Sequence, residues 1–333
     1  MQLLIVGGRG GTNIGDSFFR AAEKIGLNPF LINIQDAFKS TRLVRYINWY
    51  LMGKRPPKIG CFSSRVVEKC AGNRPKWLLV TGMAPVDKDA LREAGKLNIL
   101  RINYLTDDPW NRAHFSSWFL KALPYYDIVY STRKANLPDL SDAGCKRAEY
   151  LPFGYDHELF YPETLTEEEN EKYSSDIIFV GGADRDRIKY IDAIIKTGLR
   201  LALYGSYWER YAQARDHTLG QAGFQEVRKA TRAAKVALCL VRKANRDGHS
   251  MRSFEIPATG TCMLTEDTQE HRLFFGEEGK SVIYFSDPAE MAEKLRWLTR
   301  HESERRRLAE ASRRLIVNGS NTYADRLNLI LGV

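Results

Sequence analysis

The sequence has few cysteines, no long hydrophobic run and no excess of glycine or proline. Five cysteines are scattered over 333 residues without a Cys-x-x-Cys pair, which argues against a disulfide framework and a cysteine-based metal site. Apolar runs such as Val236–Val241 are much shorter than the roughly 20 residues of a membrane-spanning helix. Met1–Gly7 contains no basic residue, so a signal peptide is not expected. The sequence predicts a soluble protein in the reducing cytoplasm.

Acidic residues are scarce in the first half of the chain. Residues 1–150 hold 23 Lys+Arg against 13 Asp+Glu, whereas residues 151–333 hold 27 against 28. Lys39–Lys76 alone contains ten basic residues and one acid, Glu68. A surface with charge of one sign attracts partners of the other sign. We therefore predict an anionic substrate for this half, or contact with DNA or a membrane surface through residues 39–76. The alternative is that the charge only keeps the protein in solution.

The same basic segment contains apolar residues at helical spacing. They are Leu43, Val44, Ile47, Tyr50 and Leu51. This period predicts a helix whose apolar face is turned towards the core, with a basic, solvated face outside. Basic residues interleaved with Tyr46 and Trp49 would also suit nucleic acid, so nucleic-acid binding is a second interpretation.

Short runs rich in Val, Ile and Leu alternate with helical patterns along most of the chain. Such runs are typical of parallel sheets with both faces covered by helices. The predicted strands are Leu3–Val6, Pro29–Ile34, Lys76–Thr81, Asn98–Tyr104, Ile128–Ser131, Asp176–Val180, Arg200–Tyr204, Val236–Val241, Thr261–Leu264 and Ser281–Tyr284. The predicted helices include Gly15–Gly26, Lys88–Gly95, Ile188–Thr197, Ala289–Thr299 and Thr322–Leu331. The sequence predicts an α/β protein with two Rossmann-like domains.

A change of composition separates the two series of strands. Residues 151–175 contain Pro152, Gly154 and Pro162 and then the acidic, polar run Thr166–Lys172. Such stretches are typical of interdomain linkers. We predict a first domain over residues 1–155, a linker over 156–174 and a second domain over 175–315.

A glycine-rich turn lies between the first strand and the first helix. Its central residues are Gly10, Gly11, Thr12 and Asn13. Glycines in this position let a ligand approach the N–H groups at a helix N-terminus. The alternatives are a turn that lines a cleft or one that is purely structural.

Two adjacent acids follow a later strand of the first domain. Asp107, Asp108 and Trp110 lie at the carboxyl end of that strand, where open α/β sheets bind ligands. Asp107 is predicted either to act as a base in a cleft or to cap the next helix. Asp108 is predicted to cap that helix.

Two motifs of the second domain suit a phosphorylated ligand. Gly181 and Gly182 follow a strand, and Arg187 stands at the next predicted helix start, so backbone donors and a guanidinium lie together. An ordinary turn with a solvated arginine is the alternative.

The second motif has two acids, Asp247 and Glu255, with seven residues between them. Ser250 and Arg252 lie within this interval, at a predicted helix start. A helix N-terminus with an arginine suits a diphosphate, and a carboxylate one turn further can accept ribose hydroxyls. Glu255 has apolar neighbours in the sequence, which disfavours a plain surface position.

From about Asn98 onwards the chain resembles the GT-B glycosyltransferases related to the spore maturation protein CgeB. The stretches that carry the resemblance are Thr106–Trp110, Leu151–Asp156, Phe179–Gly182, Leu203–Trp208, Ser250–Ile256 and Asn321–Arg326. Asp247 and Glu255 resemble the paired glutamates of retaining GT-B enzymes, with Asp at the first position. The resemblance implies an acceptor domain and a nucleotide-sugar domain facing a central cleft. It also implies a C-terminal helix within residues 316–333 that crosses back to the first domain.

The resemblance further implies transfer of a sugar from a nucleotide diphosphate sugar, without a metal ion or other cofactor. The positions expected to bind the donor are Gly181, Gly182, Arg187, Tyr204, Gly205, Trp208, Asp247, Ser250, Arg252 and Glu255. Among these, the arginines and Ser250 are assigned to the diphosphate, Glu255 to the ribose and Trp208 to the base. Arg252, Glu255 and Asp107 are the expected catalytic residues. The paired acids favour retention of configuration, whereas a base at Asp107 would fit inversion. A catalytically silent nucleotide-sugar sensor is a further alternative.

Overall fold

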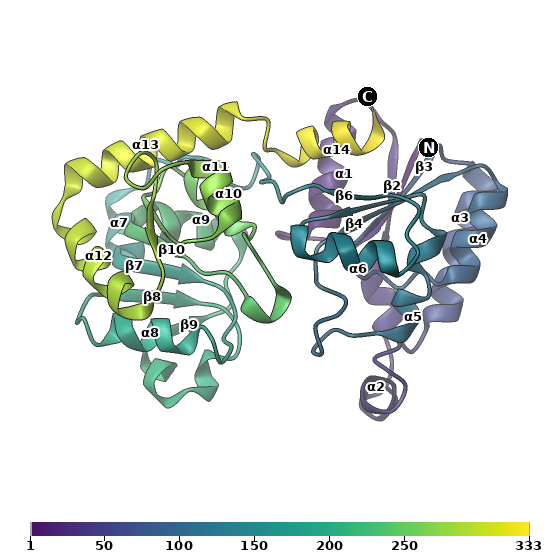
Figure 1. Cartoon of the computed structure of the whole chain (residues 1–333), viewed down its shortest axis with the longest axis horizontal. Coiled ribbons are helices and arrows are strands. Elements are labelled where there is room, and N and C mark those ends of the chain that lie inside the picture. The colour runs from purple at the N-terminus through teal and green to yellow at the C-terminus, as the bar shows by residue number, and fades with distance from the viewer. Residues whose placement is uncertain (1, 333) are drawn as a thin grey trace. The chain divides into compact units, whose positions relative to one another are not determined.

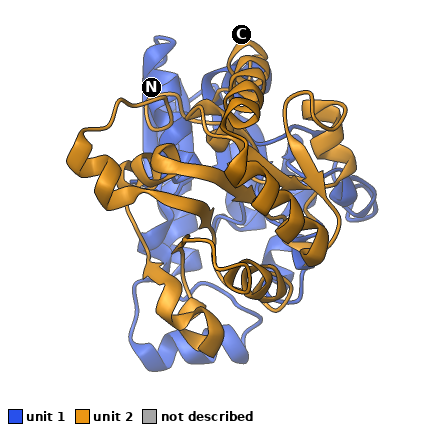
Figure 2. Cartoon of the chain, turned by 90° about the vertical axis from the view of Figure 1, so that its left-hand side faces the viewer, with its two compact units in different colours: residues 1–153, 244–246, 323–333 blue, residues 154–243, 247–322 orange. Residues whose placement is uncertain are grey.

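The computed structural model describes residues 2–332, and the chain divides into two compact units of α/β architecture (Figures 1 and 2). Unit 1 consists of residues 1–153, 244–246 and 323–333, and unit 2 of residues 154–243 and 247–322. Each unit contains one six-stranded parallel sheet with helices on both faces. The predicted α/β class with two Rossmann-like domains is confirmed.

The sheet of unit 1 has the order β2-β1-β3-β4-β5-β6. Its strands are β1 (Leu3–Gly7), β2 (Pro29–Asn33), β3 (Trp77–Thr81), β4 (Leu100–Leu105), β5 (Ile128–Ser131) and β6 (Ala148–Tyr150). The central strands β1 and β3 are buried along their whole length. Their continuous apolar runs are the pattern that a sheet covered on both faces requires.

Alternate residues of these strands enter two different cores. Leu3 and Ile5 pack with helices α1 and α14, whereas Leu4 and Val6 pack with α3 and α4. The helices of unit 1 are α1 (Ile14–Lys24), α2 (Arg42–Tyr50), α3 (Ile59–Asn73), α4 (Lys88–Lys96), α5 (Ser117–Leu120), α6 (Leu137–Asp142) and α14 (Tyr323–Leu331). The buried Arg326 of α14 donates from Nε to the carbonyl of Pro152 at 3.0 Å, which fixes this last helix on unit 1.

The sheet of unit 2 has the order β12-β11-β10-β7-β8-β9. Its strands are β7 (Ser175–Val180), β8 (Leu201–Tyr204), β9 (Thr218–Gly220), β10 (Ala234–Cys239), β11 (Met263–Glu266) and β12 (Ile283–Phe285). Its helices are α7 (Glu167–Tyr173), α8 (Ile188–Ile195), α9 (Phe224–Ala233), α10 (Arg252–Ala258), α11 (Gln269–Phe275), α12 (Pro288–Arg300) and α13 (Glu302–Asn318). Helices α8, α12 and α13 bury apolar residues in a core with β7, β8 and β10, and α9 and α10 contact the sheet as well.

Three features of the fold differ from the sequence predictions. The edge strands β6 and β9 were not predicted, because each has three residues and no long apolar run. The predicted linker, residues 156–174, is part of unit 2: Thr166 and Glu169 form a capping box at the start of α7, and Lys229 of α9 pairs with Glu169. The apolar residues Leu43, Val44, Ile47 and Tyr50 of α2 were predicted to face the core, but no residue of this helix is buried.

Within residues 2–332, no helix combines the length and the apolar character needed to cross a membrane.

Candidate functional site

In the sheet of unit 2, the direction in which successive strands are added reverses between β7 and β10. The chain runs from β7 to β8 and β9 on one side and then returns to place β10 on the other side of β7. Open α/β sheets bind ligands at the carboxyl ends of strands at such a reversal. The loops that follow β7 and β10 contain Gly181, Gly182, Arg187 and Asp247, and these predicted residues thus share one edge of the sheet.

Arg187 is a buried brace between these two loops. Its guanidinium donates to the carbonyls of Gly182 and Leu240, both at 3.1 Å, and only 8% of the residue is exposed. Burial lowers the pKa of Arg187, and the neighbouring cation of Arg242 lowers it further. Arg187, which was predicted to bind a diphosphate, therefore uses its guanidinium to bind two backbone carbonyls of unit 2.

Arg242 is a second cation at this position, and sequence reasoning missed it. The Nε atoms of Arg242 and Arg187 lie 3.5 and 3.6 Å from the same Asp184 Oδ2. The Arg242 side chain is 35% exposed, against 9% for that of Arg187. Asp247 accepts the Arg242 backbone N–H at 3.3 Å. Arg242 therefore presents the more accessible guanidinium at the end of β10. The sequence did contain a signal for Arg242. This arginine comes directly after an apolar strand, and the loop that contains Arg187 also follows one.

Gly205 has to be glycine because two loops touch backbone to backbone there. Its φ is +136°, and a Cβ atom would lie 2.1 Å from the Gly181 carbonyl oxygen. Trp208 donates from Nε1 to the same oxygen at 2.8 Å and is completely buried. In this structure Trp208 supports the loop after β7 from inside the core, and its ring does not present a face for a nucleotide base.

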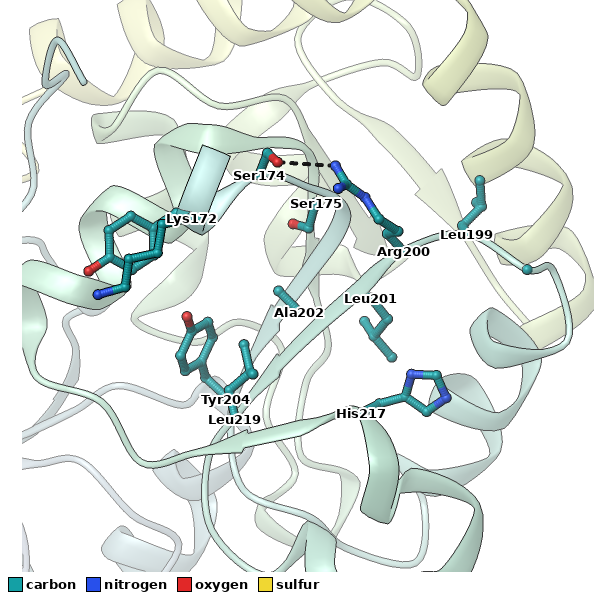
Figure 3. Close-up of a pocket in the computed structure, with 12 residues that line it drawn as sticks. Lys172, Ser174, Ser175, Leu199, Arg200, Leu201, Ala202, Tyr204, His217 and Leu219 are labelled. Atoms are coloured by element: carbon teal, nitrogen blue, oxygen red, sulfur yellow. Dashed lines mark hydrogen bonds between the residues drawn. The ribbon is translucent and has the colours of Figure 1, made fainter. Parts of the chain in front are cut away.

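Tyr204 points into a different pocket. The pocket has a volume of about 390 Å³, and Lys172, Arg200 and His217 also line it (Figure 3). Burial and the nearby Glu226 raise the pKa of Tyr204 to about 12. The structure therefore does not bring the Tyr204 side chain together with Arg187 and Gly181, although its strand end is adjacent to theirs.

Arg252 and Glu255 bind one another in the first turn of α10. They form an i,i+3 ion pair, and Glu255 is 3% exposed. Burial raises the pKa of Glu255, although the charge and hydrogen bond of Arg252 act in the opposite direction. The sequence correctly placed Glu255 away from the surface. A ligand that engages one member of this pair has to compete with the other.

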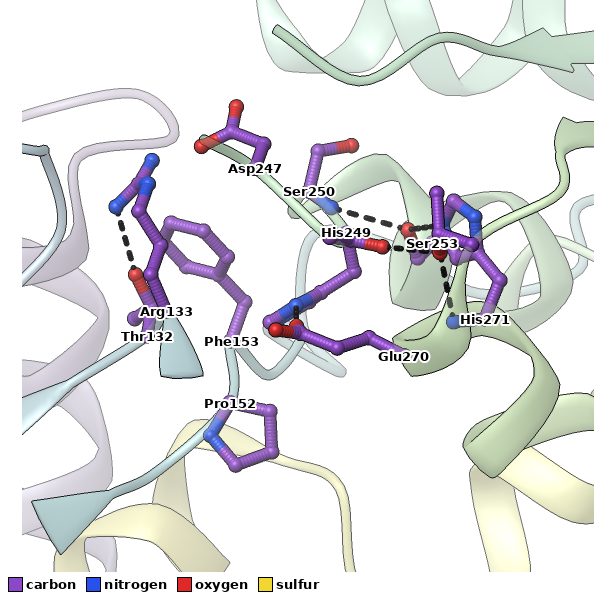
Figure 4. A network of polar contacts seen from close by, with 12 residues as sticks. Thr132, Arg133, Pro152, Phe153, Asp247, His249, Ser250, Ser253, Glu270 and His271 are labelled. Carbon is purple, nitrogen blue, oxygen red and sulfur yellow. Dashed lines mark hydrogen bonds and ion pairs between the residues drawn. The ribbon is translucent and has the colours of Figure 1, made fainter. Parts of the chain in front are cut away.

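A buried histidine orders the start of α10 (Figure 4). His271 Nδ1 lies 2.8 Å from the Glu266 carbonyl oxygen, which can only accept, so this nitrogen carries the proton. Nε2 then accepts from the Ser253 hydroxyl at 2.8 Å, and Ser253 Oγ accepts the Ser250 backbone N–H at 3.1 Å. Burial lowers the pKa of His271, which favours its neutral form, although the hydrogen bond to the Glu266 carbonyl acts in the opposite direction. No motif in the sequence connected His271 with Ser250.

The pH dependence of the stability lost in a His271→Gln variant tests this network. Because the folded-state pKa of His271 is lowered, the unfolded chain takes up a proton first as pH falls below about 6.5. The stability that neutral His271 contributes is therefore complete above that pH and declines below it. We expect His271→Gln to unfold more easily by about 1–3 kcal/mol at pH 8, with a smaller difference at pH 5. Urea unfolding across this range measures the difference, and exposed His301→Gln is the control. A difference that does not change with pH would contradict the assignment.

In unit 1 the sheet reverses between β1 and β3, next to the glycine-rich turn. A Cβ on Gly7 would lie 2.5 Å from Thr81 Oγ1 and 2.8 Å from Gly15 Cα, so strand and helix meet closely here. Gly10 and Gly11 have φ values of +84° and +58°, with open space at their Cβ positions.

Asn13 closes this glycine-rich turn, and the half-buried Thr12 precedes it. The Asn13 side chain donates to the Gly10 carbonyl at 2.6 Å instead of capping α1. The first turn of α1 thus has no side-chain cap from Asn13.

Asp107 lies in a small pocket of unit 1. Its Oδ2 accepts from the Thr106 hydroxyl at 3.1 Å. The pocket has a volume of about 210 Å³ and is otherwise lined by Phe38, Trp49, Lys54, Pro56, Met83, His114, Ser116 and Trp118. This mixture of aromatic rings, one cation and polar side chains is typical of a site for a small polar molecule or group. Asp107 is thus one of the residues that line this pocket, and its role as a base stays a prediction.

Asp108 does not cap a helix, because a turn follows it and the next helix begins only at Ser117. Its carboxylate accepts from the Trp110 backbone N–H at 3.0 Å and forms a bidentate pair with Arg246, at 2.6 and 2.9 Å. Arg246 also pairs with Asp139 at 2.7 Å. Hydrogen bonds to these carboxylates raise the pKa of Arg246. The predicted capping role is therefore replaced by an ion pair across 138 positions of the sequence.

A double-mutant cycle on Asp108 and Arg246 measures this pair. We expect Asp108→Ala to destabilise the protein by about 1–3 kcal/mol, because a charge-assisted pair is broken and Asp108 is buried. Water screens the more exposed Arg246, so the lower end of that range is expected. The double variant should lose less unfolding free energy than the sum of the losses of the two single variants. The exposed Asp142→Ala serves as control, and strict additivity of the two variants would contradict the pairing.

Among the described residues, no group of three or more His, Cys, Asp or Glu side chains is arranged to hold a metal ion.

This chain is similar to a known protein family over residues 187–332 and to solved structures along almost its whole length. Residues 187–332 match a protein family described as glycosyl transferase-like. No curated protein matches the sequence. The sucrose-phosphate synthase of Thermosynechococcus elongatus superimposes with a TM-score of 0.70 at 14% identity, over 99% of this chain and 97% of that one.

Two further solved structures are similar along the whole chain. Anabaena HepE in complex with UDP-glucose has a TM-score of 0.68 at 11% identity, covering 100% and 98% of the two chains. A trehalose-6-phosphate synthase, described in work on glycosyl transfer with retention, has a TM-score of 0.68 at 14% identity, covering 100% and 99%. The predicted GT-B fold is confirmed by these structures, and residues 187–332 carry the match to the glycosyl transferase-like family.

Proposed function

We propose that this chain transfers a sugar from a nucleotide diphosphate sugar, bound by unit 2, to an acceptor. The observation that carries the proposal is the pair of arginines, Arg187 and Arg242, at the reversal point of the unit 2 sheet. The similar fold of HepE, which was solved with UDP-glucose, supports a nucleotide-sugar donor. Within the GT-B enzymes, the CgeB-related group is the one we propose for this chain.

The proposed donor site is formed by residues of three segments: the loop after β7, the loop after β10 and the start of α10. Gly181 and Gly182 would leave room for the ligand, and Arg242, with Arg252 and Ser250, would bind the diphosphate. Arg187 would hold the two loops at the correct spacing. Glu255 would accept the ribose hydroxyls, for which Arg252 has to turn from Glu255 towards phosphate.

Cations at the diphosphate would act mainly on the bond-breaking step. Negative charge grows on the diphosphate as its bond to the sugar breaks, so fixed guanidinium groups stabilise the transition state more than the ground state. We propose that these arginines supply the required positive charge without a metal ion. The acids Asp247 and Glu255 favour a retaining reaction, and Asp107 is the residue that we propose to act on the acceptor.

A panel of nucleotide diphosphates and nucleotide sugars tests the donor. A ligand present at about 100 times its dissociation constant raises apparent stability by about 2.7 kcal/mol, which a thermal shift detects. Each stabilising nucleotide sugar is then incubated with the protein, and release of the nucleotide diphosphate is measured. Binding with turnover supports the proposal. Binding without any turnover would instead favour a catalytically silent sensor, and no binding across the panel would contradict a donor site on unit 2.

A further inference from the structure

Helix α2 and the residues directly after it form an exposed apolar surface on unit 1. Eight apolar residues of this segment are between 38% and 74% exposed. They are Leu43, Val44, Tyr46, Ile47, Trp49, Tyr50, Leu51 and Met52. We call these eight residues the α2 surface. In Figure 1, α2 projects away from the sheet of its unit. A contiguous apolar surface of this kind marks a site of interaction.

The α2 surface is surrounded by positive charge. Arg42, Arg45, Arg55 and Lys58 are all exposed. Within residues 2–332, none of these four forms an ion pair with a carboxylate. The nearest acid before them, Asp36, is shared by Lys39 and Arg65, at 2.7 and 2.9 Å. The local charge around the apolar residues is therefore uncompensated and positive.

We propose that the α2 surface docks onto an anionic lipid membrane. Helices that lie in a membrane interface combine Trp, Tyr and Leu side chains, which enter the boundary of the acyl region, with Lys and Arg that attract anionic headgroups. The α2 surface has both parts: aromatic rings at Tyr46, Trp49 and Tyr50, aliphatic side chains beside them, and four cations around them. A helix of this kind lies on a membrane and does not cross it.

Two other partners fit these observations less well. A second copy of the chain, paired through the same surface, would bring two positively charged rims together, and like charges oppose such a contact. Nucleic acid would bind the cations and could stack on the aromatic rings. It offers nothing, however, for the exposed aliphatic side chains of Leu43, Ile47, Leu51 and Met52, which gain most from burial in hydrocarbon.

The α2 surface is attached directly to the pocket that holds Asp107. Trp49 and Lys54 line that pocket. Lys54 Nζ donates to the Arg112 carbonyl, and Trp118 Nε1 donates to the Lys54 carbonyl at 3.3 Å. A membrane in contact with α2 would therefore lie near the pocket. The consequence, which rests on the proposed function, is that the acceptor is presented at the membrane surface.

Vesicle sedimentation with the full chain tests the proposal. The probes are vesicles of phosphatidylcholine alone and of phosphatidylcholine with phosphatidylglycerol, without donor or acceptor. We expect binding to the anionic vesicles only, and weaker binding when salt shortens the Debye length from about 10 Å at 0.1 M towards about 3 Å at 1 M. Because turnover is not measured, this result is separate from that of the donor panel.

Two variants and matched controls locate the contact. Leu43→Ser/Tyr50→Ser/Leu51→Ser removes apolar side chains, and Arg42→Glu/Arg45→Glu reverses two charges. Each should weaken vesicle binding by about tenfold or more, without a change in thermal stability because all five residues are exposed. The controls replace equally exposed residues elsewhere, as Leu273→Ser/Leu329→Ser and as Arg296→Glu/Arg300→Glu.

Several results would overturn the membrane proposal. Failure of the parent protein to bind anionic vesicles would do so, as would vesicle binding that the α2 variants do not weaken. DNA binding or dimerisation that is lost in the α2 variants, in place of vesicle binding, would assign the surface to nucleic acid or to a second copy. Sugar transfer in a protein that binds no vesicles would refute the membrane proposal and leave the proposed function intact.

Discussion

Replacing Arg242 with alanine is expected to lower kcat/KM for the nucleotide sugar by about 10²-fold, with little change in thermal stability. Removal of one preorganised group that stabilises charge in a transition state has a cost of this order. Arg242 is the more exposed of the two cations beside Asp184, and within residues 2–332 its side chain makes no hydrogen bond to a backbone carbonyl like those of Arg187. Initial rates at several donor concentrations, together with a melting curve, measure both effects.

Arg187 provides the contrast for this prediction. Its replacement leaves the Gly182 and Leu240 carbonyls without their donor, so Arg187→Ala should lose stability as well as activity, by about 1–3 kcal/mol. Arg242→Lys should restore part of the activity, and the exposed Arg296→Ala on α12 should behave like the parent. If Arg242→Ala turns over the donor normally, Arg242 does not bind the diphosphate, and Arg252 and Ser250 remain as its proposed ligands.

Replacing Asp107 with asparagine is expected to lower kcat by about 10²–10⁴-fold, the range that a general base contributes. The fold should be unaffected, because an amide oxygen in place of Asp107 Oδ2 can still accept from the Thr106 hydroxyl. The KM for the donor should change little, since donor binding is assigned to unit 2. Steady-state rates with both substrates varied separate these effects.

Asp142→Asn, an exposed change on the same unit, is the control for Asp107→Asn. A parent-like kcat for Asp107→Asn would exclude Asp107 as the base and move the search to His114, which lines the same pocket. A lowered melting temperature without loss of activity would mean that Asp107 is a structural residue of the turn.

The sequence predicted the existence of a strand wherever the strand is a continuous apolar run. β5, at Ile128–Ser131, was predicted with its observed bounds, because a strand buried on both faces is a continuous apolar run. The edge strands β6 (Ala-Glu-Tyr) and β9 (Thr-Leu-Gly) were missed because neither contains an apolar run, whereas the equally short edge strand β12 (Ile-Tyr-Phe) was predicted.

The same rule explains the incorrect prediction for α2. An apolar residue at every third or fourth position shows that a helix has an apolar face, but not which element covers that face. In α3, the next helix, Phe62 and Val66 are buried against unit 1, whereas in α2 no residue is. Packing against the rest of the unit decides between these outcomes, and the period of the pattern does not contain that information.

The α/β class, the two-domain organisation, the glycine-containing and charged loops after β7 and β10, and the burial of Glu255 could all be predicted from the sequence. Each of these depends on local pattern: apolar runs, glycines after strands, and charged residues at helix starts. Only the tertiary structure decided that Arg242 stands beside Arg187, that Asp108 pairs with Arg246, that His271 orders the start of α10, and that Trp208 is enclosed in the core. These contacts join residues far apart in the chain, and which of them form depends on how strands are ordered in the sheets, because strand order brings loop ends together.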